Sequence, residues 1–240
     1  MTHPQHEFRM LGSSVQVQNF GDEFLLLRAK DMDASTFSRL GRCLFERQFS
    51  FVAEVIATEV EICLKLNQRF DQHGLVQLQQ LETLPAATTN GEDRTVLRLP
   101  VWFSTDDDWQ TVCKSTGQDR GDYLSQLLEC RFRVAMIGFL PGFVYLNGLP
   151  DSLQVARKSN PDRQAEANSF AVGGRYAGIY SLPSPAGWNV LGRLGISLLQ
   201  TNLLPPMSLQ ADDEFVLELV SRQEYQRLQR TSATLEQFNG

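Results

Sequence analysis

Histidine is the residue type that this sequence lacks most clearly. Only His3, His6 and His73 occur among its 240 residues, and two of them lie close to the N-terminus. A Ser-His-Asp triad or a histidine-based zinc site therefore has almost no material to draw on. His73 precedes a glycine in a polar segment, and we expect it in a solvent-exposed turn. The scarcity of histidine predicts a protein without a bound metal.

Long apolar runs, basic blocks and paired cysteines are also missing. No segment approaches the roughly 20 apolar residues of a membrane-spanning helix, and the first residues lack the apolar core of a signal peptide. The formal net charge of −6 and the scattered lysines and arginines do not suit a surface that binds nucleic acid. The four cysteines form no CxxC pair, which is typical of reduced, buried thiols. We expect a cytoplasmic protein that binds neither membrane nor nucleic acid.

The first 85 residues carry alternating strand and helix patterns. Apolar side chains at helical spacing after a capping Asp33 predict a helix over 34–47 with one shared face; they are Phe37, Leu40, Leu44 and Phe45. Apolar side chains that alternate with polar ones predict strands, over residues 8–17, 24–27 and 60–66. A second helix is expected over 75–81. Helices packed over one face of a mainly antiparallel sheet would follow.

Two groups of acidic residues invite a chemical interpretation. Glu59 and Glu61 could be paired carboxylates for acid–base catalysis, but the strand pattern favours a position on its solvated side. Asp106, Asp107 and Asp108 could form a divalent-metal loop, yet the ligand spacing and the glycine of an EF-hand are absent. We therefore expect these three acids to cap the helix that follows.

A change in composition between residues 85 and 93 marks a candidate linker. Small, polar and turn-forming residues replace the periodic pattern there. We place one domain over 1–88 and a second over 89–240. Strands and helices are expected in the second domain, with strands over 95–103, 132–139, 196–199 and 215–220, helices from 109 and over 122–129, and a polar helical tail over 223–238.

Glycine, proline and aromatic residues crowd together between Met136 and Arg193. Glycine permits positive φ, while proline fixes φ and removes a hydrogen-bond donor, so this mixture predicts tight turns between short buried strands. Neither a Walker A motif nor a GxGxxG motif is present. Loops of this kind often carry a binding site.

The same stretch resembles a known family. The residues that carry the resemblance are, in order, Gly138-Phe139-x-Pro141-Gly142-Phe143-x-Tyr145-Leu146, Arg157-Lys158, Gly173-Gly174, Gly178-Ile179-Tyr180, Ser184-Pro185-x-Gly187-Trp188 and Gly192-Arg193. In this order and spacing they are similar to the KipI family. That family includes the B-type subunit of 5-oxoprolinase, the small subunit of allophanate hydrolase-type proteins, and one half of the carboxyltransferase domain of urea carboxylase.

The resemblance implies an α+β fold with two parts. The first is a small N-terminal two-layer α/β domain, DCoH-like and with a mainly antiparallel sheet, and the second is a C-terminal cyclophilin-like β-barrel. It also implies a larger homologous partner subunit, which resembles KipA or the C-type subunit of 5-oxoprolinase. In the 5-oxoprolinase system the complex opens 5-oxoproline to glutamate with ATP hydrolysis, so ATP would act at the level of the complex and no cofactor would be bound tightly. The KipI protein instead inhibits a histidine kinase, and a non-catalytic regulatory protein is the alternative.

Physical chemistry indicates which matched residues could act on a small amide or lactam. Arg157 and Arg193 are permanent cations suited to a carboxylate, and Tyr180 can orient a carbonyl, so we assign these three a catalytic role. Seven residues are expected to contact the substrate, namely Phe139, Pro141, Phe143, Tyr145, Gly174, Gly178 and Trp188. Two alternatives stay open, because the arginines could form surface salt bridges and the aromatic rings could simply pack a core. Since the matched motifs hold no nucleophile with its own base, the chain alone is expected to be an inactive part of a hydrolase.

Several positions depart from the family pattern. Leu128 stands where a histidine is usual, Asp162 reverses the charge of an arginine, and Tyr176-Ala177 replace Gln-Thr. Residues 166–170 read Glu-Ala-Asn-Ser-Phe instead of Pro-Ala-Gly-Ser-Val. Polar groups are lost while turn-forming glycines remain. The sequence therefore preserves the residues that shape the turns of the family better than the polar residues expected at its site.

Overall fold

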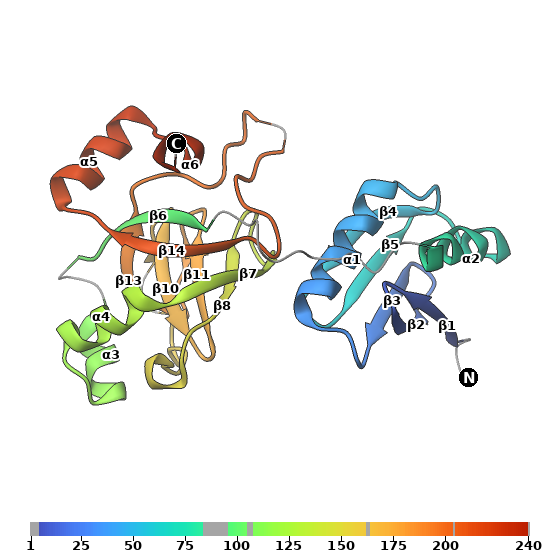
Figure 1. The fold of residues 1–240 in the computed structure, drawn as a ribbon, viewed down its shortest axis with the longest axis horizontal. Helices are drawn as coiled ribbons and strands as arrows, with labels where there is room; N and C mark the ends of the chain where they lie inside the picture. The colour runs from blue at the N-terminus through green and yellow to red at the C-terminus, as the bar shows by residue number, and fades with distance from the viewer. Residues whose placement is uncertain (1–4, 84–95, 105–107, 162–163, 204, 240) are drawn as a thin grey trace. The chain divides into compact units, whose positions relative to one another are not determined.

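Two compact units divide the chain, Met1–Asp93 and Arg94–Gly240. The computed structural model describes residues 5–83, 96–104, 108–161, 164–203 and 205–239 (Figure 1). The segment that we interpreted as a linker lies outside these described residues.

The first unit is a five-stranded antiparallel sheet with its helices on one face (Figure 1). Its strands, in the spatial order β1-β2-β3-β5-β4, are β1 (Gln5–Met10), β2 (Ser13–Phe20), β3 (Phe24–Ala29), β5 (Ile62–Leu66) and β4 (Val52–Ala57). The helices are α1 (Ala34–Arg47), α2 (Gln72–Gln79) and the short 3₁₀ helix η1 (Gln80–Thr83). Leu40 and Leu44 of α1 and Leu78 of α2 pack into one core with Val17 and Leu27 from alternate positions of the strands. Alternation along the strands therefore decides which face of the sheet the helices cover.

Helix α1 has the predicted bounds. Asp33 caps it, because its carboxylate accepts a hydrogen bond from the Thr36 N–H at 2.9 Å. Phe37, Leu40 and Leu44 are buried, but Phe45 is 69% exposed, so the expectation that Phe45 shares their face is wrong. Successive residues turn by about 100° around a helix, which places Phe45 beyond the edge of the apolar stripe.

Other expectations for the first unit are corrected by its turns. Residues 8–17 form two strands, because Leu11 and Gly12 adopt positive φ values of 51° and 85° and reverse the chain. Glu59 is buried, contrary to its expected solvated position. It precedes β5 in a turn where the Thr58 hydroxyl accepts the Glu61 N–H at 3.0 Å. His73 is exposed but lies in the first turn of α2 and not in a loop.

The second unit is a closed barrel of seven strands in the order β10-β11-β8-β7-β14-β6-β13. These strands are β6 (Leu97–Trp102), β7 (Arg131–Ile137), β8 (Val144–Asn147), β10 (Ser169–Gly173), β11 (Tyr176–Tyr180), β13 (Asn189–Leu194) and β14 (Glu214–Leu219). The helices are α3 (Trp109–Thr116), α4 (Arg120–Glu129), the 3₁₀ helix η2 (Asp151–Leu153), α5 (Arg222–Thr231) and α6 (Leu235–Asn239). A two-stranded ladder pairs β9 (Gln164–Ala165) with β12 (Ser184–Pro185). Figure 1 shows α5 and α6 on one side of β6 and β14, with α3 and α4 at another side of the barrel.

The interior of the barrel is filled by side chains. Phe170 is fully buried, and its ring centroid lies 5.9 Å from that of Phe132, which in turn lies 5.8 Å from that of Phe215. Such packing is typical of a small closed barrel and leaves ligands to its outer surface. The α+β fold with an antiparallel sheet and a barrel is thus confirmed.

Residues 196–199 were wrongly predicted as a strand, since Ile196 and Leu198 are buried but the backbone makes only an isolated bridge between Leu199 and Met207.

Candidate functional site

The predicted aromatic residues gather on the outer face of the barrel. Strand alternation points one set of side chains of β8, β10 and β11 into the core and the other set outward. The outward set contributes Ala171 and Tyr180 to a separate apolar cluster, which also contains Phe143, Ala165, Ala186, Trp188 and Val190. Tyr145 and Tyr176 are partly buried against it. Of the predicted site residues, Phe143, Tyr180 and Trp188 belong to this cluster and Tyr145 packs against it; the sequence did not indicate that they lie outside the barrel.

Trp188 lies flat across two glycines. A Cβ atom on Gly173 would stand 2.7 Å from the indole ring, and one on Gly178 would stand 2.8 Å from it. The rings of Phe143 and Tyr145 meet the indole edge-on, with centroids 5.5 and 5.6 Å away. Only 5% of the surface of Trp188 is exposed. We call this packed group, Trp188 with Phe143 and Tyr145 over Gly173 and Gly178, the Trp188 bed. The two glycines are required because no side chain fits beneath the ring.

Arg157 lies over this bed, on a well-anchored segment. Its guanidinium carbon is 5.1 Å from the centroid of the Trp188 ring, a favourable cation–π geometry. Before it, the Val155 carbonyl accepts the Gly174 N–H at 2.7 Å. The amide of Asn189 donates to the Ala156 carbonyl at 3.1 Å. Arg157 itself is exposed, so a fixed backbone presents its charge to solvent.

The neighbouring Lys158 fixes the same segment through Asp108. Its Nζ lies 2.7 Å from the Asp108 carboxylate, and the two side chains are only 13% and 12% exposed. The same carboxylate accepts the Val190 N–H at 2.8 Å. Asp108 therefore does not cap α3 with its side chain, contrary to expectation. Asp106 and Asp107 lie outside the described residues, and within the described part no cluster of His, Cys, Asp or Glu could hold a metal ion.

Tyr180 is buried behind the outer surface. Only 2% of the residue is exposed, and its ring centroid lies 4.9 Å from that of Phe143. Burial raises the pKa of its hydroxyl above the ordinary value, while a hydrogen bond from the Trp188 backbone and the charge of Arg157 act in the opposite direction. The phenol is therefore protonated at neutral pH.

Arg193 lies in the same cross-strand row as Tyr180. Ser169 of β10 pairs with Tyr180 on one side and with Arg193 on the other. Arg193 Nη1 is 2.5 Å from a carboxylate oxygen of Glu166, so this arginine forms an ion pair. Asn168 spans the row, because its N–H donates to the Tyr180 carbonyl at 2.6 Å and its carbonyl accepts from the Leu194 N–H at 2.8 Å.

Three buried polar atoms of this row have no hydrogen-bond partner within the described residues. They are Asn168 Oδ1, Ser169 Oγ and Arg193 Nε. An unsatisfied buried polar group costs about 1–3 kcal/mol, so such a concentration is unusual in a stable structure. In the sequence, residues 166–170 stand out only as a departure from the family pattern. Nothing in the sequence connects Glu166 or Ser169 with Arg193, since that proximity depends on the strand order.

The turn before β8 presents Phe139 to solvent. Phe139 is 75% exposed and has a φ of 75°, which is rare for a large side chain. The Ser181 hydroxyl donates to the Pro141 carbonyl at 2.5 Å, and Gly142 supplies a second positive φ of 74°. Phe139 and Pro141 thus flank the bed as exposed residues, while Gly174 lies at the opposite end of the β10–β11 hairpin from Ser169.

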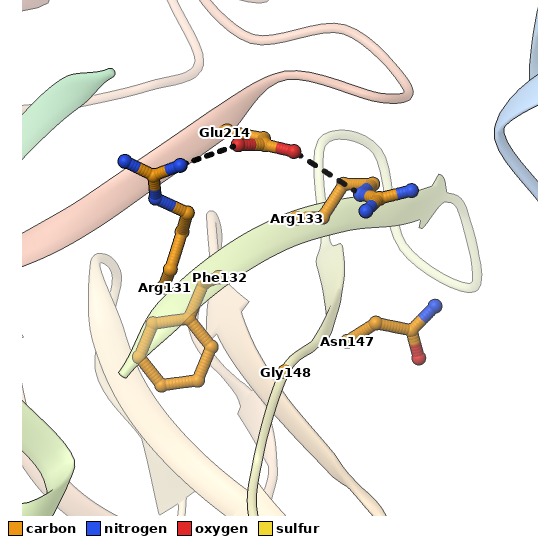
Figure 2. A pocket seen from close by; sticks show the side chains of 6 residues that line it. All are labelled: Arg131, Phe132, Arg133, Asn147, Gly148 and Glu214. Atoms are coloured by element: carbon orange, nitrogen blue, oxygen red, sulfur yellow. Dashed lines mark ion pairs between the residues drawn. The ribbon is translucent and has the colours of Figure 1, made fainter. Parts of the chain in front are cut away.

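A polar hollow of about 290 Å³ lies elsewhere on the barrel (Figure 2). It is lined by Arg131, Phe132, Arg133, Asn147, Gly148 and Glu214. Figure 2 shows the Glu214 carboxylate between the two guanidinium groups, 3.7 Å from Arg131 and 3.5 Å from Arg133. None of the predicted site residues lines this hollow.

The remaining departures from the family pattern have structural places. Leu128 packs against the barrel core, and Ala177 lies inside the barrel. Tyr176 meets Tyr145 edge-on at the rim of the bed, with a centroid distance of 5.9 Å. Asp162 lies outside the described residues. Leu128 therefore has a packing role where a proton-transfer group was expected in the family.

Known proteins resemble both the sequence and the fold. The B-type subunit of 5-oxoprolinase from Haemophilus influenzae is 40% identical over 89 residues, which are 36% of this chain and 42% of that protein. The Bacillus subtilis protein of the same name is 27% identical over 135 residues, or 55% of this chain and 56% of that protein. The chain thus spans about half the length of these curated relatives. Within the described helices, none is long and apolar enough to cross a membrane.

Solved structures share the fold over most of the chain. TTHA0988 matches 82% of this chain and 40% of its own, with a TM-score of 0.71 and 25% identity. The Kluyveromyces lactis urea carboxylase matches 95% of this chain and 24% of its own, with a TM-score of 0.64 and 16% identity. The fold is therefore carboxyltransferase-like. The family model for the carboxyltransferase domain, subdomain C and D, matches residues 15–209, and the chain belongs to this family.

Proposed function

We propose that this chain is the small, B-type subunit of a hydrolase that opens a cyclic amide of the 5-oxoproline kind. It works with a larger homologous subunit and is inactive alone. ATP hydrolysis in the assembled cytoplasmic complex drives the reaction. The observation that carries the proposal is the similarity to three curated proteins, each named as the B-type subunit of a 5-oxoprolinase.

The outer face of the barrel is chemically suited to such a substrate. The guanidinium groups of Arg157 and Arg193 can hold a carboxylate or an oxygen that gains negative charge. The packed Trp188 ring supports Arg157, whose exposed guanidinium is available to a ligand. Tyr180 packs in the same cluster as Trp188, and Ser169 separates it from Arg193 in the strand register. We assign the activation of water and the use of ATP to the larger subunit.

The assay is 5-oxoproline-dependent formation of glutamate and ADP by the complex co-purified with the larger subunit. We expect activity only when both subunits are present. Arg193→Ala is expected to lower kcat/KM by about tenfold or more, because a charge-assisted contact is lost. Arg98→Ala is the matched control, since Arg98 is an exposed arginine of the same unit, paired with Glu218. A stable complex that forms no glutamate would contradict the proposal.

A non-catalytic binding role is the second candidate function. The observation that favours it is Phe139, an exposed aromatic residue held at positive φ by a clamped turn. Backbone strain of this kind persists where the surrounding structure enforces it, often at binding sites. Association with a sensor histidine kinase, accompanied by inhibition of the kinase and by no opening of 5-oxoproline, would favour this role.

A further inference from the structure

Arg193 already binds a carboxylate, and that carboxylate belongs to the protein itself. Glu166 approaches Nη1 of Arg193 at 2.5 Å. The Glu166 side chain is 65% exposed, whereas that of Arg193 is 27% exposed. Glu166 is therefore a mostly solvent-exposed carboxylate that contacts a mostly buried guanidinium group on the outer face of the barrel. Little else restrains such an exposed side chain, so another carboxylate can compete for its place.

Two buried hydrogen-bond donors near Glu166 have no acceptor within the described residues. Nε–H of Arg193 and the hydroxyl of Ser169 are donors, both are buried, and neither has a partner within the described residues. Ser169 faces Arg193 directly in the register of β10 and β13. A planar group with two acceptor oxygens would satisfy both donors, as carboxylates do for guanidinium groups. These atoms have no contact with solvent, so a ligand reaches them only when a neighbour moves.

We infer that Arg193 and Ser169 form a subsite for the carboxylate of a small substrate, and that Glu166 occupies this subsite in competition with the substrate. The inference rests on the proposed function, because a lactam such as 5-oxoproline carries the required carboxylate. When the substrate binds, Glu166 turns outward into solvent and the guanidinium exchanges one carboxylate for another. Asn168, whose amide oxygen is also unpaired, can take a hydrogen bond from the lactam N–H of the same substrate.

The two possible roles of Glu166 predict opposite changes in carboxylate affinity when Glu166 is removed. If Glu166 only held Arg193 in position, its removal would weaken carboxylate binding. If Glu166 occupies the subsite, its removal strengthens binding. An exposed ion pair of this kind contributes little free energy, so Glu166→Gln is expected to raise the affinity about threefold to fivefold.

The experiment is a titration of the intact 240-residue chain followed by NMR of its tryptophan indole N–H signals. Trp102 pairs with Arg193 across β13 and β6, so its signal reports on the subsite. The probes are 5-oxoproline, 2-pyrrolidinone, which is the same lactam without the carboxylate, and acetate. Glu218→Gln is the matched control, because it removes one exposed acid from an ion pair on the same barrel.

We expect Glu166→Gln to strengthen binding of 5-oxoproline and acetate, and not of 2-pyrrolidinone, while Glu218→Gln changes nothing. Adding Ser169→Ala to Glu166→Gln should reverse the gain. Since no partner is found for the Ser169 hydroxyl within the described residues, this change is not expected to unfold the barrel.

Unchanged or weaker carboxylate binding by Glu166→Gln, or no binding of any probe to any variant, would overturn the inference. The proposed function fails separately. If Glu166→Gln gains affinity for acetate and 5-oxoproline but the complex with the larger subunit opens no lactam, the subsite stands and the hydrolase does not. If the complex is active and Glu166→Gln gains no affinity, the reverse holds.

Discussion

At the residue scale, the shape of the outer face of the barrel depends on two glycines. Gly173 and Gly178 allow Trp188 to rest directly on strands β10 and β11. Gly187 stands next to Trp188 in the sequence, yet a Cβ atom there would meet nothing within 4 Å. Neighbouring glycines thus have different roles, and only the contacts across strands distinguish them.

Gly178→Ala is expected to lower the free energy of unfolding by about 1–3 kcal/mol, as overpacking of a filled site does. The new methyl group would stand 2.8 Å from Trp188 and 3.0 Å from Phe143. Urea unfolding followed by tryptophan fluorescence measures the loss. Gly187→Ala is the control and should stay within about 0.5 kcal/mol of the parent protein. Equal effects of the two changes would refute the flat packing of the indole ring.

Several residues of the sequence motif lie close together in the structure, whereas the partner of Arg193 lies outside the motif. Arg157 is presented to solvent over an aromatic ring, and the cluster of Tyr180 and Trp188 could be assembled from the motif alone. The partner of Arg193 could not be assembled in this way. Glu166 lies far from Arg193 in the sequence and comes near it only because β10 and β13 are neighbours in the barrel. Nothing local to either residue carries that information.

At the element scale, the start of α3 is tied to the segment that carries Arg157. Asp108 contacts both Lys158 and the Val190 N–H, so one carboxylate joins a helix, a loop and strand β13. Local patterns do predict elements when cap and periodicity agree, as in α1 with its Asp33 cap. Local patterns fail at Ile196 and Leu198. These two side chains are buried at alternate positions as in a strand, but their backbone forms no ladder of strand hydrogen bonds.

Asp108→Ala is expected to cost about 2–4 kcal/mol of stability, near the low end of the 3–5 kcal/mol typical of a fully buried pair. The change removes the carboxylate partner of an enclosed lysine and the acceptor of the Val190 N–H. Urea denaturation gives the difference. Glu218→Ala breaks the exposed pair with Arg98 and should cost no more than about 0.5 kcal/mol. Similar losses for both variants would mean that Asp108 is not an enclosed anchor.

At the scale of the whole molecule, the described residues of each unit have their own main core. One core belongs to the five-stranded sheet with α1 and α2, and the other fills the barrel. In the structure the units divide after Asp93, whereas the sequence placed a boundary after residue 88 from its change in composition. The sequence could not indicate closure of the barrel, because β6 pairs in parallel with β14 across more than a hundred residues.

The two units are expected to unfold separately. The three tryptophans, Trp102, Trp109 and Trp188, belong to the second unit, so fluorescence follows the barrel alone, whereas far-UV circular dichroism follows both units. In urea the two signals should give different midpoints. A fragment of residues 94–240 should reproduce the fluorescence midpoint of the full chain. Coincident transitions together with an unfolded fragment would contradict independent folding.

Closure of the barrel also limits how this protein can associate. Each of the seven described barrel strands has a neighbour on each side, so these strands offer no free edge for β-augmentation by a partner chain. In the first unit, by contrast, β1 and β4 are edge strands. A partner that engages the barrel strands must therefore recognise side chains, such as the exposed Phe139, and its specificity can be altered by point substitutions without disturbing a shared sheet.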